Sequence, residues 1–136
     1  MTDMVVDTSA LMSIMLREPS RPWLLEQLNQ SGLRAMSAPS ALEFRIVLEA
    51  RRPELTDMGP RVLRDGRIKV VDFTPDLVER GLHAWHRFGK GRHPAALNFG
   101  DCCTYALAEE TGLPILCIGN DFAQTDLPIL RPPVTA

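Results

Sequence analysis

Four acidic residues stand at points where a parallel α/β fold would bring distant parts of the sequence together. Asp7 directly follows the first apolar run, and Asp121 comes shortly after the last strongly apolar run. Glu43 and Asp101 fall in the first turns of two segments with helical spacing. The crevice of an open parallel sheet lies beyond the carboxyl ends of its strands, and the helices that follow those strands begin at the same edge. We therefore expect these four carboxylates to face one crevice.

Clustered carboxylates need a positive partner, and the sequence places no lysine or arginine beside all four of these acids. Mg²⁺ and Mn²⁺ are hard cations that prefer oxygen ligands. One such ion lowers the pKa of a bound water, and a second ion ~4 Å away stabilises the leaving oxygen. The sequence therefore predicts metal-assisted hydrolysis of phosphodiesters, in which Asp7, Glu43, Asp101 and Asp121 are the metal ligands and the catalytic residues.

Each acid also has an ordinary structural role open to it. Asp7 could cap the first helix, and Glu43 or Asp101 could favour a helix N-terminus electrostatically. Asp121 could be a turn residue. Asp126 lies close enough in sequence to compete with Asp121 for the role of fourth acid, although Thr125 and Asp126 could equally cap a terminal turn. We favour Asp121 because it follows the last apolar run more directly.

The two helical acids are expected to lie along buried stripes. Their apolar neighbours at helical spacing are Ile46 and Val47 for Glu43, and Tyr105 and Ala108 for Asp101. A carboxylate on a buried stripe must have a partner, because burying it alone costs several kcal/mol. The predicted surroundings of the acids thus agree with a bound cation.

The elements that must position these acids alternate along the chain. Short apolar runs predict strands at 4–6, 33–36, 68–71 and 115–118, with a further candidate at 129–130. Helical spacing predicts helices over 10–16, 23–28, 40–50 and 99–111, a shorter one from residue 56, and a long one from 74 to 85. This alternation is typical of right-handed βαβ units. We expect a single domain over 1–136, with a mainly parallel central sheet covered by helices on both faces, that is, three α/β/α layers.

Composition narrows the class of protein. The net charge of −2 and the sequence pI of 5.9 argue against nucleic-acid binding through overall positive charge, so such contact would need a local patch. The three cysteines, Cys102, Cys103 and Cys117, fit small buried apolar residues better than a disulfide framework or a zinc site. No apolar run is long enough for a membrane span and no secretory signal is evident, so we expect a cytoplasmic protein.

A basic loop precedes Asp101 and could supply the local patch. It contains Lys90, Arg92 and His93. These side chains could contact nucleic-acid phosphates beside the acids and offset the negative balance of the chain there. The alternative is a loop whose charges are only solvated. The proximity of the loop to the acids favours contact with nucleic acid.

Segments spread over the whole chain resemble the motifs of PIN-domain toxins of the VapC type. The segments are Val5–Leu11, Ser40–Glu43, Lys90–His93 with Leu97–Cys102, and Gly119–Phe122 with Thr125–Leu127. Their order and spacing also match that family. The first motif alone is weak, whereas the combination is specific.

The resemblance implies a PIN fold and a Mg²⁺-dependent endoribonuclease, with Mn²⁺ as a second candidate ion, that is the toxin of a toxin–antitoxin pair. It makes Asp7 and Asp101 the principal metal ligands, with Glu43 and Asp121 completing the set. Ser9 would support the site by hydrogen bonding to a metal-bound water or to a carboxylate. The implied partners are an RNA substrate, a second copy of the chain, and a VapB-like antitoxin whose tail blocks the acidic cleft, often with a basic side chain.

Other functions compete with this interpretation. A phosphotransferase of the haloacid dehalogenase type would need a second Asp where Ser9 stands. A non-catalytic PIN-fold module for RNA or protein binding and dimerisation is the main alternative, and the presence of all four acids argues against it. The sequence leaves open which RNA is cleaved.

Overall fold

Five parallel strands form one sheet in the computed structural model, which describes residues 2–133. The strands are β1 (Met4–Val6), β2 (Arg34–Ser37), β3 (Ile68–Val71), β4 (Ile115–Leu116) and β5 (Ile129–Leu130). Their order across the sheet is β3-β2-β1-β4-β5, so the first strand of the chain lies in the middle. Met1 and residues 134–136, which the single-domain prediction includes, lie outside the described range.

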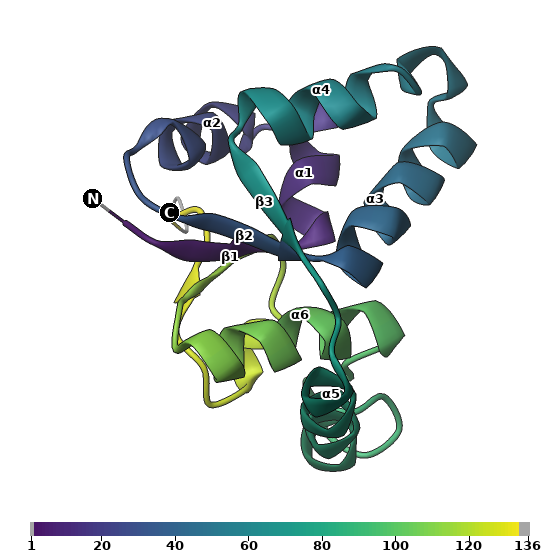
Figure 1. Cartoon of the computed structure of the whole chain (residues 1–136), viewed down its shortest axis with the longest axis vertical. Coiled ribbons are helices and arrows are strands. Elements are labelled where there is room, and N and C mark those ends of the chain that lie inside the picture. Colours follow the sequence, from purple (N-terminus) through teal and green to yellow (C-terminus); the bar gives the residue numbers. More distant parts are fainter. Residues whose placement is uncertain (1, 134–136) are drawn as a thin grey trace.

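Helices cover both faces of this sheet (Figure 1). On one face lie α1 (Thr8–Met15), α2 (Arg21–Asn29), α3 (Ala38–Arg51) and α4 (Met58–Asp65), and on the other lie α5 (Pro75–Phe88) and α6 (Phe99–Thr111). Two short 3₁₀ turns, η1 (Pro53–Leu55) and η2 (Phe122–Gln124), complete the chain. The three-layer α/β/α architecture with a parallel sheet is therefore confirmed.

The central strand β1 contributes to two separate cores. Successive strand residues point to opposite faces, and accordingly Met4 and Val6 join the apolar cluster under α1 to α4, while Val5 joins the cluster under α5 and α6. All three are fully buried. A strand buried on both faces is a continuous apolar run, which explains why the sequence placed β1 correctly.

Polar side chains fix where the helices begin. The side chains of Asp7, Ser37, Thr74 and Asn98 each accept a hydrogen bond from a backbone N–H in the first turn of the following helix. At the start of α6, Asn98 and Asp101 form a reciprocal capping box. Because the chain enters α1, α3 and α6 near the carboxyl ends of the strands, these starts lie along one edge of the sheet.

The structure corrects some sequence predictions. Ile46 is 58% exposed, and the buried side of α3 is formed by Ala41, Phe44 and Leu48 instead. The prediction of a buried stripe beside Glu43 was therefore wrong for Ile46, although Val47 is partly buried and packs against the core. The stripe beside Asp101 is confirmed by buried Tyr105 and Ala108. β2 is shifted by one residue, to 34–37, and β4 ends at Leu116 rather than at residue 118.

Two further predictions from composition concerned the state of the cysteines and the absence of a membrane span. All three cysteines are free and buried, as expected for small apolar residues, and burial raises the pKa of Cys102 and of Cys103 to about 11. Of the helices between residues 2 and 133, none is both long and apolar enough to cross a bilayer.

Candidate active site

Asp7 lies at the carboxyl end of the central strand and is the most buried of the four acids, with 4% of its surface exposed. Its backbone N–H donates to the carbonyl oxygen of Leu116 at 3.0 Å, which holds the end of β1 against β4. Its Oδ2 accepts from the N–H of Ser9 at 3.0 Å, and its Oδ1 accepts from the hydroxyl of Thr104 at 2.7 Å. Asp7 is therefore both the cap of α1 and a carboxylate with a fixed orientation.

Glu43 reaches from the second turn of α3 to the first turn of α6. A methyl group built on Gly100 would lie 2.6 Å from Glu43 Oε1 and still closer to Oε2. The carboxylate thus rests directly on the backbone of Gly100, next to Asp101, and no larger residue could take that place without moving it. This contact brings two of the predicted acids together from distant parts of the chain.

The charges of the other three predicted acids all affect the pKa of Asp101. Burial, which is the largest cause, and the negative charges of Asp7, Asp121 and Glu43 together raise its pKa from the ordinary value to about 7, against the opposing effect of the backbone hydrogen bond at Asn98. The negative charge of each neighbouring acid contributes because a nearby like charge disfavours the ionised form of a carboxyl. The four acids therefore share one electrostatic environment.

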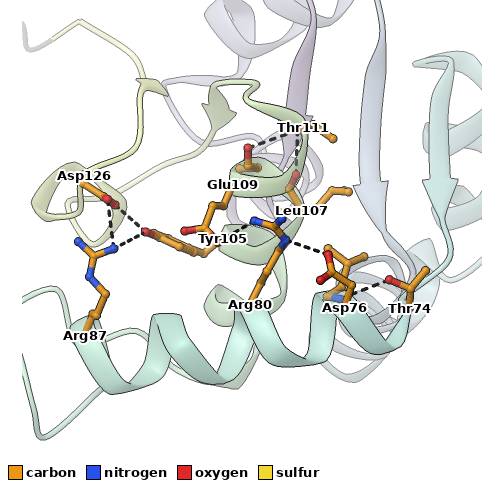
Figure 2. Close-up of polar contacts among 11 residues, drawn as sticks. Thr74, Asp76, Arg80, Arg87, Tyr105, Leu107, Glu109, Thr111 and Asp126 are labelled. Carbon is orange, nitrogen blue, oxygen red and sulfur yellow. Dashed lines mark hydrogen bonds and ion pairs between the residues drawn. The ribbon is translucent and has the colours of Figure 1, made fainter.

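Asp121 and Asp126 differ in their surroundings. Asp121 is exposed at the start of η2, and its side chain makes no capping hydrogen bond. Asp126 instead accepts from the Tyr105 hydroxyl at 2.6 Å and pairs with Arg87 at 3.2 Å, as Figure 2 shows. These contacts keep the pKa of Asp126 below its usual value. The structure thus engages Asp126 in contacts that join α5 and α6 to the C-terminal segment, whereas the charge of Asp121 acts on Asp101.

Sequence reasoning missed the hydroxyl side chains behind Asp7. Thr104 on α6 donates to the Asp7 carboxylate, and Ser40 on α3 lies 3.1 Å from the Thr104 hydroxyl. A signal was present: Thr104 is a polar residue within the otherwise apolar run that follows Asp101, and a buried hydroxyl needs a partner. The predicted Ser9 accepts a hydrogen bond from the backbone N–H of Ile118 at 3.1 Å.

Comparison with known proteins decides the family. The PIN domain model matches residues 4–127. The VapC ribonuclease Mb2004c of Mycobacterium bovis and Ribonuclease VapC36 of Mycobacterium tuberculosis are each 42% identical to this chain over 126 residues, covering 91% of this chain and 91% of each relative. The chain belongs to the VapC group of the PIN-domain family.

Solved structures agree with this PIN fold at low sequence identity. VapC20 of Mycobacterium tuberculosis, described as a Sarcin-Ricin loop cleaving toxin, superposes with a TM-score of 0.77 at 17% identity, covering 96% of this chain and 100% of that one. VapBC2 from Rickettsia felis, bound to a DNA fragment from its promoter, gives a TM-score of 0.72 at 12% identity, covering 96% and 98%. At such identities the likeness concerns the fold alone.

The acids of this PIN domain suit a hydrated divalent cation. Over residues 2–133, no three His, Cys, Asp or Glu side chains lie close enough to form a ready-made cage. The ion pairs recorded in that range also leave Asp7, Glu43, Asp101 and Asp121 without a basic partner. Mg²⁺ keeps several of its waters and binds proteins through one or two carboxylates. Neighbouring carboxylates with uncompensated charge therefore fit such an ion.

The basic loop of the PIN domain is partly engaged with its own surroundings. The Arg92 guanidinium lies 4.0 Å from the centre of the Trp85 ring, and His93 Nδ1 accepts from the N–H of Ala95 at 3.0 Å. Lys90 is exposed. Two of the three predicted RNA contacts thus help to shape the loop between α5 and α6.

Proposed function

We propose that this chain is a Mg²⁺- or Mn²⁺-dependent endoribonuclease, a single nuclease domain that serves as the toxin of a VapBC-type toxin–antitoxin pair. The observation that carries the proposal is the gathering of the acids at one edge of the sheet, where Glu43 lies against Gly100 beside Asp101 and the charges of Asp7, Asp121 and Glu43 add to the effect of burial on the pKa of Asp101. The proposed activity is also supported by similar proteins of comparable length, which are named VapC ribonucleases. The cytoplasm, where cellular RNA is found, is the proposed place of action.

In this proposal Asp7 and Asp101 hold the cation, and Glu43 and Asp121 complete the acidic set. When bound, the ion supplies an acidified water and stabilises charge on the phosphodiester. The chain itself supplies orientation: Asp7 is fixed through both carboxylate oxygens, and Glu43 is seated on Gly100. Ser9 supports the site because its hydroxyl accepts from Ile118 and still has its own proton to donate.

RNA binding is assigned to the loop that contains Lys90, Arg92 and His93. Lys90 fits this role best, since it is exposed and positively charged. Arg92 can present its guanidinium edge to a phosphate while its face stays on Trp85. These contacts would place the negative backbone of RNA beside carboxylates that otherwise repel it.

The proposed protein partners are a VapB-like antitoxin and a second copy of this chain. Solved relatives include VapBC complexes from Rickettsia felis and Salmonella typhimurium. The four acids would attract a basic side chain from an antitoxin tail, which would compete with the cation. For dimerisation the chain offers exposed apolar side chains on three helices, namely Leu42, Ile46, Val78, Leu82, Trp85 and Phe99.

A groove of about 490 Å³ runs through this apolar surface and is lined by Pro39, Val78, Leu82, Trp85 and Phe99, among others. Apolar surface of this kind marks an interface in most soluble proteins. The test is the molar mass in solution, expected at twice the 15.2 kDa of one chain. A monomer at all concentrations would remove the dimer from the proposal and leave the enzyme intact.

Metal removal tests the proposed activity directly. We expect purified protein to cleave RNA with Mg²⁺ or Mn²⁺, to lose all cleavage in EDTA, and to regain it when the ion is restored. Sequencing the cleavage ends in total cellular RNA would identify the substrate. Cleavage that persists in EDTA would exclude the metal-dependent mechanism. Absence of cleavage with metal, together with harmless expression in cells, would favour a non-catalytic PIN-fold binding module.

Substitution of Gly100 by Ala is expected to reduce cleavage about tenfold or more while leaving the fold stable. The added methyl group displaces the Glu43 carboxylate, and misplacing a group around a metal typically costs 10- to 100-fold. Ala otherwise favours a helix by about 1 kcal/mol over Gly. The measurements are the initial rate of RNA cleavage and the midpoint of urea unfolding.

Gly81→Ala is the matched control, because a methyl group there meets its neighbours only at ordinary distances of 3.6–4.0 Å. It should leave the rate of cleavage unchanged. Equal rates for Gly100→Ala and Gly81→Ala would show that the position of Glu43 does not matter.

A further inference from the structure

We infer that Thr104, backed by Ser40 and Ser37, is a positioning residue that fixes the orientation of Asp7 for the cation. The inference rests on the proposed function, since it concerns how that metal site is held. Its basis is a buried row of hydroxyls that runs from the end of β2 through the start of α3 and across α6 to Asp7.

The contacts in this row are short and continuous. Ser37 Oγ lies 2.7 Å from Ser40 Oγ, which lies 3.1 Å from Thr104 Oγ1, which lies 2.7 Å from Asp7 Oδ1. Ser37, Ser40 and Thr104 are each at most 1% exposed. Water therefore cannot supply alternative partners, and the hydroxyls must satisfy one another.

The number of protons that each group can donate determines which hydroxyl is the donor in each contact of the row. An ionised carboxylate can only accept, so the single hydroxyl proton of Thr104 goes to Asp7. Thr104 must then accept from Ser40, and Ser40 must accept from Ser37. Ser37 in turn accepts from the backbone N–H of Ser40 at 3.2 Å. Each bond polarises the next in such a chain, so the last donor is strengthened.

The row also ties together the helices that carry the acids. Ser40 stands three residues before Glu43 on α3, and Thr104 stands three residues after Asp101 on α6. Residues three apart lie on the same side of a helix. The Ser40–Thr104 contact therefore fixes the spacing of the two acid-bearing helices as well as their relation to Asp7.

Asp7 is left with a restricted set of free acceptor sites. Thr104 occupies one site on Oδ1 and the Ser9 N–H occupies one on Oδ2, whereas a carboxylate offers about four lone-pair sites in all. The carboxylate cannot rotate without breaking both bonds. The sites that remain are consequently held in one direction, as a metal ligand requires.

The test is Mn²⁺ binding, measured by calorimetry, for the wild-type protein, Thr104→Val and Thr104→Ser. Valine keeps the shape and removes the donor, so affinity should fall about tenfold. Serine restores the donor and should return affinity to within about threefold of wild type. In RNA cleavage, the Mn²⁺ concentration for half-maximal rate should rise in Thr104→Val more than the maximal rate falls.

Thr111→Val is the matched control, since this hydroxyl lies on the same helix and donates only to backbone carbonyls near its end. It should bind Mn²⁺ like the wild type. Ser40→Ala provides a second variant if Thr104→Val does not fold, and its affinity should fall about threefold because the Thr104 hydroxyl loses its donor.

The outcomes separate this inference from the proposed function. If the wild type binds Mn²⁺ and the Thr104→Val or Ser40→Ala protein binds it equally well, the inference is wrong and the metal-dependent function stands. If Thr104→Ser fails to recover affinity, the loss comes from packing and the inference is again wrong. A wild type that does not bind Mn²⁺ overturns both.

Discussion

Asp7→Asn is expected to slow RNA cleavage about a thousand-fold while preserving the fold. Loss of a ligand charge removes several kcal/mol of stabilisation, and each 1.4 kcal/mol corresponds to about a factor of ten in rate. Asn is as good a helix cap as Asp, so α1 should start as before. The measurement is the cleavage rate of RNA at saturating Mg²⁺, alongside thermal unfolding of both proteins.

Asp126→Asn is the natural control for this variant. Its carboxylate is committed to Tyr105 and Arg87 (Figure 2), so its loss should weaken the C-terminal tie and leave cleavage within a few-fold of wild type. Full activity in Asp7→Asn, or an inactive Asp126→Asn that is still folded, would contradict our assignment of the acids.

The metal-free protein is expected to lose stability as the pH rises from about 4 to about 7, and Asp101→Asn should abolish most of that loss. The pKa of Asp101 is about 7 in the folded protein and 3.8 as its ordinary value. Between these values the folded state binds more protons than the unfolded state, so the free energy of unfolding falls with rising pH. Above pH 7 Asp101 is ionised in the folded protein, and the whole loss of unfolding free energy is present.

The size of this effect follows from the shift. Each pKa unit corresponds to about 1.4 kcal/mol, and partial exposure reduces the total to something on the order of 2 kcal/mol. Urea unfolding at pH 5 and pH 8 in EDTA measures it, and Mg²⁺ should restore stability at pH 8. A wild-type protein whose pH dependence matches that of Asp101→Asn would show that folding does not raise the pKa of Asp101.

The acids could be found from sequence because their position depends only on topology. Asp7 follows a strand that is apolar throughout, and Asp101 falls in the first turn of a helix that its apolar spacing predicts, so a parallel sheet was enough to place both at one edge. The rotation of a helix about its own axis is harder to predict. α3 buries Phe44 and Leu48 instead of Ile46, since the apolar residues on this helix occupy more than one face.

Contacts between distant side chains were beyond the reach of sequence patterns. The hydroxyls of Ser40 and Thr104 are 64 positions apart, and their meeting depends on how two helices approach each other across the sheet edge. The contact of the Glu43 carboxylate with Gly100 likewise depends on how these two helices approach each other. The contacts of Asp126 with Tyr105 and Arg87 are likewise between residues that no local pattern connects.

The central place of β1 has a consequence for the timing of folding. Val5 in β1 pairs with Ile115 in β4, so β1 gains its second neighbour only after β4 has been synthesised. Pairing across so long a separation is slow, because a large loop must close first. Asp121 emerges later still. The edge of the sheet that carries the acids is therefore assembled only after segments that lie far apart in the chain have all been made.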